Sequence, residues 1–321
     1  MLVEGRWTED WHPMQAKDAK GGFVRQASQF RNWVTLDGRP GPTGEGGFAA
    51  AAGRYHLYVA LTCPWASRTL IARKLKGLED AIAVSVVEPG LTEQGWRFGD
   101  DRGATLDPIH RAAYLHEIYT RADRRYTGRA TVPVLWDKER GTIVNNESAD
   151  IVRMFNSGFG DLAKPSPDLY PSDITTEIDA LNAQMYDGLN NGVYRAGFAT
   201  TQAAYEDAYR QVFATLSELE RRLSDGRQFL FGDRFTESDI RAFVTLVRFD
   251  VAYHGLFKCN RRRIVDFPSL QAYLLRVLDW NGIRETVSID HIKRGYYSIK
   301  SVNPAGVVPL GPDIAGLTSA A

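Results

Sequence analysis

The chain has 321 residues, of which 44% are hydrophobic and 24% charged, so it has the composition of an ordinary globular protein and the length for two domains. Its 39 Lys and Arg residues balance its 39 Asp and Glu residues, so we expect neither nucleic acid nor a membrane as a partner. No apolar stretch approaches the roughly 20 residues that span a bilayer, and the start, MLVEGRWTEDWHP, lacks the pattern of a secretory signal.

The cysteine and histidine residues point to a reduced environment without a metal site. Cys63 and Cys259 are too few for a disulfide framework, and their spacing fits no zinc motif. The six histidines form no HExxH or paired arrangement. We therefore expect a cytoplasmic protein that holds no metal.

The first 53 residues are expected to form an N-terminal extension. Aromatic side chains are scattered here among few aliphatic ones, which favours an extended segment that wraps a folded body: Trp7, Trp11, Phe23, Phe30 and Trp33. The next elements are sharper. Residues 54–62 (RYHLYVALT) have the aromatic and branched side chains of a strand, and AIAVSVV at 81–87 is an apolar run of strand length.

A helix is predicted between these two strands. Pro64 suits its first turn, where a missing N–H costs nothing, and Lys76-Gly77 suits its end. The inward-facing side chains would be Trp65, Leu70, Ile71 and Leu75. A strand–helix–strand unit of this kind makes its two strands parallel.

Four further elements complete the first domain. A polar insertion precedes a helical pattern at 109–120, TVPVLWD (131–137) and TIVNN (142–146) form a predicted hairpin, and SADIVRMF (148–155) begins a helix. The order β-α-β-α-β-β-α is that of a thioredoxin-like domain, which we assign to residues 54–163.

The rest of the chain is predicted to be helical. A Pro-rich linker at 164–171 leads into an all-α domain at 172–300, and TESD at 236–239 has the pattern of a capping box, in which Asp239 is a folding residue. The expected helices cover 172–190, 202–224, 236–252 and 267–280. The last part, 301–321, is rich in Pro and Gly and is expected to be an extended tail.

Cys63 falls where the first strand of this domain ends and the helix begins. The helix dipole and the N–H groups of the first turn favour a thiolate there. A dithiol reductase places its second cysteine three residues on, and Ala66 holds that position here. A mixed disulfide on Cys63 would then wait for an external thiol. The plain alternative is that Cys63 is a buried small hydrophobic residue.

Several stretches carry a resemblance to a known family. CPWA (63–66), TVP (131–133) and Glu147-Ser148 resemble the corresponding motifs of glutathione transferases. More narrowly, the chain resembles the glutathionyl-hydroquinone reductases, the xi class, nearly end to end. The long matching stretches are FRNWV (30–34), RYHLYVALTCPWASRT (54–69), TVPVLWD (131–137), NNES (145–148), YHGLFKCN (253–260) and SVNPAGVVPLGP (301–312).

The resemblance implies a fold, an activity and partners. The fold would be a thioredoxin-like α/β domain followed by an all-helical domain. The activity would be reduction of glutathionyl-hydroquinones to hydroquinones through a Cys63–glutathione disulfide, with glutathione as co-substrate, no metal and oxidised glutathione as a product. A homodimer is expected from the family.

The resemblance also assigns a glutathione site. Val132-Pro133 would form the cis peptide that faces the bound tripeptide, while Glu147 and Ser148 would hold its γ-glutamyl end. Local sequence alone equally allows Ser148 to be an ordinary helix N-cap. Two further positions match glutathione contacts in the family: Trp96, which would pack on the peptide, and Arg129, which would pair with a carboxylate.

Both of these assignments have alternatives. Trp96 equally suits a core anchor of the insertion. Arg124 and Arg125 lie near Arg129, which is preferred because it is two residues before TVP.

Three tyrosines match the family's quinone pocket: Tyr194, Tyr253 and Tyr296. Their spacing does not show that they converge, and each alone also suits a core tyrosine with a satisfied hydroxyl. If they converge, they could bind substrate hydroxyls and supply a proton. Cys259 has no helix-start context and is expected to be structural.

Two other functions stay open. An omega-like thioltransferase or dehydroascorbate reductase would need Cys63 but not the tyrosines. A non-catalytic binding module with this fold would need neither, and its Cys63 thiol would titrate near the ordinary value of about 8.5.

Overall fold

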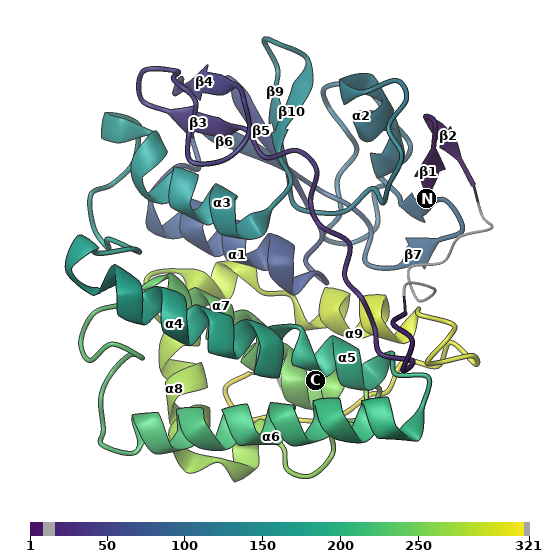
Figure 1. The fold of residues 1–321 in the computed structure, drawn as a ribbon, viewed down its shortest axis with the longest axis vertical. Helices are drawn as coiled ribbons and strands as arrows, with labels where there is room; N and C mark the ends of the chain where they lie inside the picture. The colour runs from purple at the N-terminus through teal and green to yellow at the C-terminus, as the bar shows by residue number, and fades with distance from the viewer. Residues whose placement is uncertain (9–16, 318–321) are drawn as a thin grey trace. The chain divides into compact units, whose positions relative to one another are not determined.

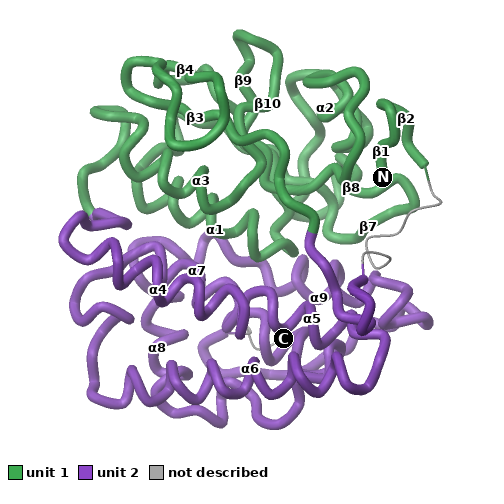
Figure 2. The backbone as a smooth tube through the Cα atoms, viewed as in Figure 1, with its two compact units in different colours: residues 1–15, 26–166 green, residues 16–25, 167–321 purple. Residues whose placement is uncertain are grey.

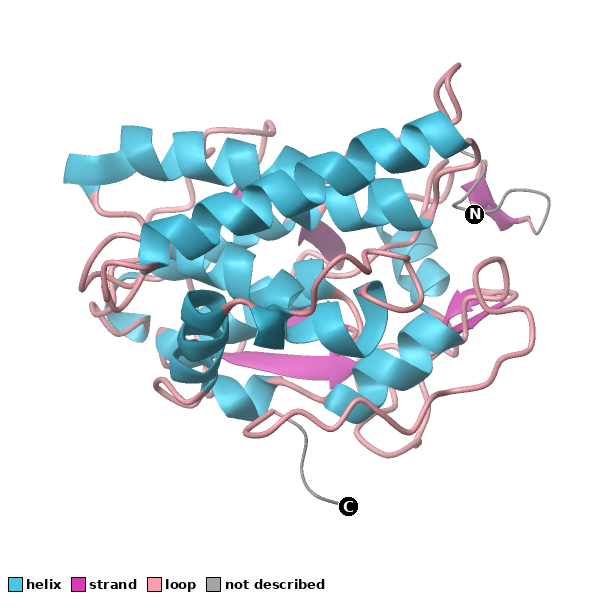
Figure 3. Cartoon of the chain, turned by 90° about the horizontal axis from the view of Figure 1, so that it is seen from below, coloured by secondary structure: helices cyan, strands magenta, loops and turns pink. Residues whose placement is uncertain are grey.

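A computed structural model of the chain describes residues 1–8 and 17–317, so Trp11 lies outside the described residues (Figure 1). The chain divides into two compact units. The first comprises residues 1–15 and 26–166, and the second comprises 16–25 and 167–321 (Figure 2). Residues 16–25 therefore belong to the second unit although the chain on both sides of them belongs to the first. Helices account for most of the regular structure (Figure 3).

A four-stranded sheet forms the centre of the first unit. Its order is β10 (Thr142–Asn145), β9 (Val134–Asp137), β5 (Tyr55–Val59) and β6 (Ile82–Val86). Strand β5 pairs in parallel with β6 and antiparallel with β9, and β9 and β10 form the predicted hairpin. Every residue of β5 is buried, as expected for an interior strand with a continuous apolar run.

Helix α1 (Pro64–Leu75) connects β5 to β6 and confirms the predicted parallel crossover. Pro64 occupies its first turn, and Gly77 follows its end with a φ of 62°, in the left-handed region that glycine tolerates. Of the expected inward side chains, Leu70, Ile71 and Leu75 are buried, whereas Trp65 is only half-buried. Helix α3 (Ser148–Arg153) packs beside α1.

The helix expected at 109–120 begins later, as α2 (Leu115–Ala122), so its predicted start was wrong. The cause is the buried carboxylate of Asp107, which accepts hydrogen bonds from the backbone N–H groups of Ile109, His110 and Ala112. These bonds hold a turn where the helix would otherwise begin. The insertion before it contains a small hairpin, β7 (Leu91–Thr92) with β8 (Gly95–Trp96).

The N-terminal extension contributes two further two-stranded sheets. One pairs β1 (Leu2–Val3) with β2 (Arg6–Trp7), and the other pairs β3 (Trp33–Thr35) in parallel with β4 (Gly47–Ala49). The Trp7 ring stacks on His116 at 4.8 Å between ring centroids, and Phe30 stacks on Tyr126 at 5.6 Å. The extension is thus packed against the folded body of its unit through its aromatic residues.

The helices of the second unit include four that the sequence predicts and two that it does not. The predicted ones are α4 (Thr175–Met185), α6 (Gln202–Leu223), α7 (Glu237–Arg248) and α8 (Pro268–Leu278). Helices α4 and α7 continue as π-helical turns at Tyr186–Asn190 and Phe249–Tyr253. The other two are α5 (Gly192–Gly197) and α9 (Ile289–Tyr297), which are six and nine residues long and so shorter than the window over which apolar periodicity is judged.

The capping box that begins α7 is confirmed. Thr236 accepts a hydrogen bond from the Ser238 N–H, and the Asp239 carboxylate accepts from the Thr236 N–H at 2.8 Å. Asp239 also accepts from the Leu230 N–H and from the Tyr273 hydroxyl. Burial raises the pKa of Asp239 to about 6, against the opposing effect of these hydrogen bonds.

The raised pKa of Asp239 predicts a pH dependence of stability. Because the folded protein binds this proton more tightly than the unfolded chain, the contribution is full below about pH 4 and is lost as the pH rises through about 6. The neutral variant Asp239→Asn lacks this titration. We expect the free energy of unfolding of the wild type, relative to that variant, to fall by roughly 2–3 kcal/mol between pH 4 and pH 7. Urea unfolding at both pH values measures it, and a constant difference would contradict it.

Candidate active site

Cys63 is the N-cap residue of α1, with the extended backbone (φ −80°, ψ 119°) that precedes a helix. Its N–H donates to the Ala60 carbonyl at 3.0 Å, and its carbonyl accepts the first helical bond, from Ser67 at 3.0 Å. The side chain is half-buried, whereas Ala66 is fully buried. The thiol therefore lies at the positive end of a helix dipole with part of its surface open, an arrangement that favours a thiolate.

The Val132–Pro133 peptide lies beside this thiol and is cis. The Cys63 Sγ donates to the Val132 carbonyl at 3.7 Å, within the range of a sulfur hydrogen bond. The preceding residue, Thr131, is held at both backbone groups by the Tyr119 hydroxyl. The Thr131 carbonyl accepts from this hydroxyl at 2.7 Å, and the Thr131 N–H donates to the hydroxyl oxygen at 3.2 Å. Two predicted site residues, 69 positions apart in the sequence, are thus brought together.

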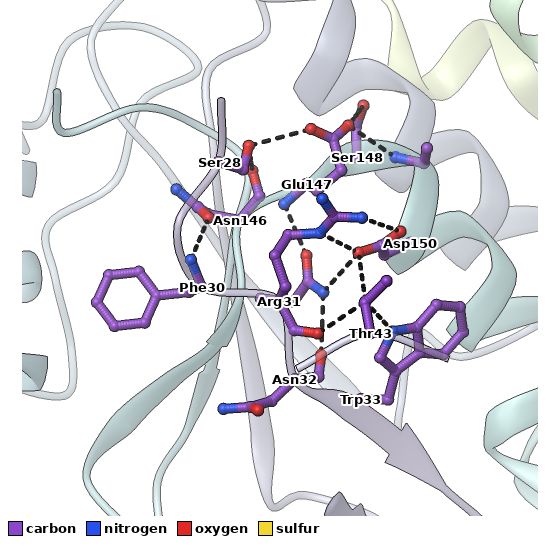
Figure 4. A network of polar contacts seen from close by, with 12 residues as sticks. Ser28, Phe30, Arg31, Asn32, Trp33, Thr43, Asn146, Glu147, Ser148 and Asp150 are labelled. Atoms are coloured by element: carbon purple, nitrogen blue, oxygen red, sulfur yellow. Dashed lines mark hydrogen bonds and ion pairs between the residues drawn. The ribbon is translucent and has the colours of Figure 1, made fainter. Parts of the chain in front are cut away.

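Glu147 and Ser148 lie at the start of α3. Glu147, not Ser148, is the N-cap residue, since its carboxylate accepts from the Ala149 N–H at 3.2 Å. Ser148 is the first helical residue, so its alternative assignment as an N-cap is wrong. The Glu147 carboxylate also accepts from the hydroxyl of Ser148 at 3.4 Å and from that of Ser28 at 3.0 Å (Figure 4).

A polar network from the N-terminal extension holds this helix start, and the sequence did not reveal it. The Arg31 guanidinium makes a two-pronged ion pair with Asp150, at 2.5 Å from Nε and 3.0 Å from Nη2 (Figure 4). Asn145 donates to the same carboxylate at 3.1 Å and accepts from the Glu147 N–H at 2.7 Å. The backbone of Glu147 is therefore fixed through Asn145 and Asp150 by a segment over 110 residues earlier.

The network extends to the neighbouring backbone of the extension. The Phe30 N–H donates to the Asn146 side-chain oxygen at 3.1 Å, and the backbone N–H of Asn32 donates to the Val144 carbonyl at 3.0 Å. A signal for this contact did exist, because FRNWV and NNES are both among the stretches that resemble the family. Nothing in either stretch alone indicates that the two meet.

Trp96 and Arg129 also belong to the first unit. Trp96 is on β8, paired with Leu91, and its side chain is half-buried. Arg129 is half-buried as well, and its carbonyl accepts from the Tyr126 hydroxyl at 3.2 Å. The alternatives Arg124 and Arg125 are both exposed.

The three predicted tyrosines converge within the second unit. Tyr194 is on α5, Tyr253 ends the π-helical turn after α7, and Tyr296 is on α9. The Tyr296 hydroxyl lies 2.6 Å from that of Tyr194 and 2.6 Å from that of Tyr253. We call these three residues the tyrosine cluster.

The members of the cluster differ in burial. Tyr253 and Tyr296 are buried, and this burial raises the pKa of each phenol well above its ordinary value, while the charge of Arg248 opposes the rise. Tyr194 is half-buried and forms the more open end of the chain of hydroxyls. Such a chain can accept hydrogen bonds from a ligand or pass it a proton.

Cys259 lies outside this arrangement. It is fully buried, and burial raises the pKa of its thiol to about 12, so it stays protonated at neutral pH. Its expected structural role agrees with this environment.

Comparison with known proteins identifies the family. A model described as the glutathione S-transferase N-terminal domain matches residues 62–157, and one described as the C-terminal domain matches 202–276. The chain belongs to the glutathione transferase family, and within it to the xi class of glutathionyl-hydroquinone reductases. The fold is accordingly that of a glutathione transferase, with a thioredoxin-like domain and an all-helical domain.

Individual relatives support this placement. The chain is 51% identical to the glutathionyl-hydroquinone reductase YqjG of Escherichia coli, over 97% of this chain and 94% of that one. It is 48% identical to the glutathionyl-hydroquinone reductase PcpF of Sphingobium chlorophenolicum, over 99% and 98%. Among solved structures, glutathione-bound YqjG from Escherichia coli K-12 is similar with a TM-score of 0.90 and 48% sequence identity. The match covers 98% of this chain and 97% of the YqjG chain.

A xi-class glutathione transferase from Natrialba magadii is similar too. Its TM-score is 0.89 at 46% identity, and the match covers 100% of this chain and 95% of the other chain.

Within residues 1–8 and 17–317, no helix has the length and apolar character needed to cross a bilayer.

The Arg31–Asp150 pair generates a prediction about stability. Asp150→Asn removes the negative charge of a mostly buried carboxylate that faces the partly exposed Arg31, and it leaves one amide oxygen where two carboxylate oxygens now accept from Arg31 and Asn145. We expect a loss of about 1–3 kcal/mol in the free energy of unfolding, because hydrogen bonds to a charged group are lost or weakened. The matched control Glu218→Gln breaks the exposed pair with Arg221 and should change it by less than about 0.5 kcal/mol. Equal effects of the two variants in urea unfolding would refute a special role for the pair of Arg31 with Asp150.

Proposed function

We propose that this chain reduces glutathionyl-hydroquinones to hydroquinones, with glutathione as the co-substrate. The observation that carries the proposal is Cys63, at a helix start beside the cis Val132–Pro133 peptide with no second cysteine in its helix. The names of two relatives about half identical over nearly the whole chain give the substrate class. A homodimer and a cytoplasmic location belong to this proposal on the family resemblance.

The glutathione site in this proposal is built from residues of the first unit. The backbone of Val132 would pair with the peptide of glutathione, which brings the glutathione sulfur to Cys63. The Glu147 carboxylate would take the ammonium of the γ-glutamyl end, and the Ser148 hydroxyl would bind its carboxylate. Trp96 would pack on the peptide, and Arg129 would pair with the remaining carboxylate. The solved structure of YqjG with bound glutathione supports glutathione as the ligand.

The proposed reaction has two half-reactions. In the first, the Cys63 thiolate attacks the sulfur of the glutathionyl-hydroquinone, a sulfur–sulfur bond forms, and the bond from sulfur to the aromatic carbon breaks. The bonding pair goes to that carbon, which takes a proton from the tyrosine cluster. In the second, a further glutathione thiolate attacks the mixed disulfide, oxidised glutathione leaves and the Cys63 thiolate returns. The thiol proton that this second glutathione gives up restores the phenol of the tyrosine cluster.

A second candidate is thioltransfer on small mixed disulfides. It is favoured by a relative from Schizosaccharomyces pombe named glutathione S-transferase omega-like 2, which is 46% identical over 94% of this chain. This activity also needs Cys63. It breaks no bond to carbon, so it has no use for a phenolic proton donor.

Replacing Cys63 tests the covalent step. Cys63→Ala should lower the turnover of a glutathionyl-hydroquinone by about 1000-fold or more, because no mixed disulfide can form. Cys63→Ser should lose the reaction as well, since an alcohol does not serve as thiolate or leaving group, and addition of glutathione to a simple electrophile is expected to appear instead. Product formation is followed by chromatography, and normal turnover in either variant would rule out the mechanism.

Removing the central phenol separates the two candidates. Tyr296→Phe breaks both hydrogen bonds of the cluster, so we expect turnover of a glutathionyl-hydroquinone to fall by roughly 100-fold or more. Reduction of a small mixed disulfide should stay unchanged. The control Tyr205→Phe removes a hydroxyl that bonds to the Lys258 carbonyl and should leave both rates unchanged. Parallel losses on both substrates in Tyr296→Phe would argue against the cluster as proton donor.

A further inference from the structure

A guanidinium lies over one ring of the tyrosine cluster. The Cζ atom of Arg25 is 4.9 Å from the centroid of the Tyr194 ring and 5.4 Å from that of Phe23. Its Nε donates to the Asn191 side chain at 3.0 Å, and its Nη2 atom is shielded from solvent. The cation is thus aimed at the ring face and partly removed from water, where its attraction to the ring is strongest.

The segment that carries Arg25 is anchored at several points of the second unit. Phe23 is buried and packs on Phe198 at 5.5 Å between centroids. The Thr200 N–H donates to the Gly21 carbonyl at 3.1 Å, and the Thr201 hydroxyl donates to the Lys20 carbonyl at 2.8 Å. These anchors directly follow α5, the helix that bears Tyr194, so the cation and the ring are fixed to the same part of the fold.

The three phenols are not equivalent places for a negative charge. Burial raises the pKa of Tyr253 and Tyr296 well above the ordinary value, and Arg248 only partly offsets it. Tyr194 is half-buried and has the Arg25 guanidinium on its ring face. A cation is drawn to the ring of a neutral phenol, and more strongly to that of a phenolate. A charge left on the cluster is therefore most stable on Tyr194.

We propose that Arg25 is a positioning residue for proton donation by the tyrosine cluster. Its guanidinium holds the Tyr194 ring and stabilises the phenolate that remains on Tyr194 once the proton has left. The inference rests on the proposed function. When the carbon–sulfur bond breaks, the aromatic carbon gains the bonding pair and a proton. The proton comes from Tyr194 directly, or it comes from Tyr296, which is then reprotonated by Tyr194. Tyr194 is left as the phenolate and recovers a proton from the thiol of the second glutathione. The charge exists only between the two half-reactions.

The test separates the half-reactions by rapid mixing. Arg25→Gln should slow the formation of hydroquinone in a single turnover by roughly 3- to 30-fold. The second half-reaction, in which glutathione attacks enzyme that carries the Cys63–glutathione disulfide and oxidised glutathione is released, breaks no bond to carbon and should keep its wild-type rate. Without the cation Tyr194 is a weaker acid, so the alkaline limb of the first half-reaction should move to higher pH.

Three variants show whether Arg25 acts through Tyr194. Arg25→Lys keeps a charge over the ring and should recover part of the rate. In a Tyr194→Phe background, Arg25→Gln should cause no further loss, because no phenolate can form under the guanidinium at position 194. The matched control Arg262→Gln removes a guanidinium that lies 4.0 Å from the Phe267 ring centroid and should leave both half-reactions unchanged. Melting temperatures confirm that each variant is folded.

Several outcomes would overturn the role of Arg25. They are an unchanged first half-reaction in Arg25→Gln, an equal loss in both half-reactions, or the same loss with Phe at position 194. Failure of the wild type itself to reduce a glutathionyl-hydroquinone would instead contradict the proposed function, so the two failures are distinct.

Discussion

The junction between β5 and α1 constrains the rest of the site. Pro64 has no N–H to donate and fits only the first turn, so the helix begins there and the residue before it must be the N-cap. That residue is Cys63, and its sulfur is held against the Val132 carbonyl from another strand connection. The reactive atom is thus placed by backbone geometry, four residues after the end of an interior strand that cannot shift without disturbing a four-stranded sheet.

Local patterns predicted the elements near this junction well. The strand at Tyr55–Val59, the helix after Pro64 and the strand at Ile82–Val86 depend on propensity and apolar runs over a few residues, and the structure confirms them. The start of α2 was wrong because one buried carboxylate, Asp107, organises a turn through three N–H groups. A rule based on apolar spacing does not include such a side chain.

The site was less accessible from the sequence because its contacts join distant residues. The resemblance named Tyr194, Tyr253 and Tyr296, but their hydroxyls meet across separations of 102 and 43 residues, which no local pattern encodes. The pair of Arg31 with Asp150 spans 119 residues and was not foreseen at all. Arg25 was missed for the same reason, since a cation over a ring leaves no trace in spacing.

The division of the chain at residues 16–25 has a consequence for how this protein can be engineered or compared. Arg25 contacts the tyrosine cluster in the second unit, whereas Ser28, three residues later, bonds to Glu147 in the first. The stretch before residue 54 is therefore not an appendage that a shorter relative could simply lack. Any alignment or truncation that starts at the thioredoxin-like domain discards Arg25, which contacts the tyrosine cluster, and Ser28, which bonds to Glu147.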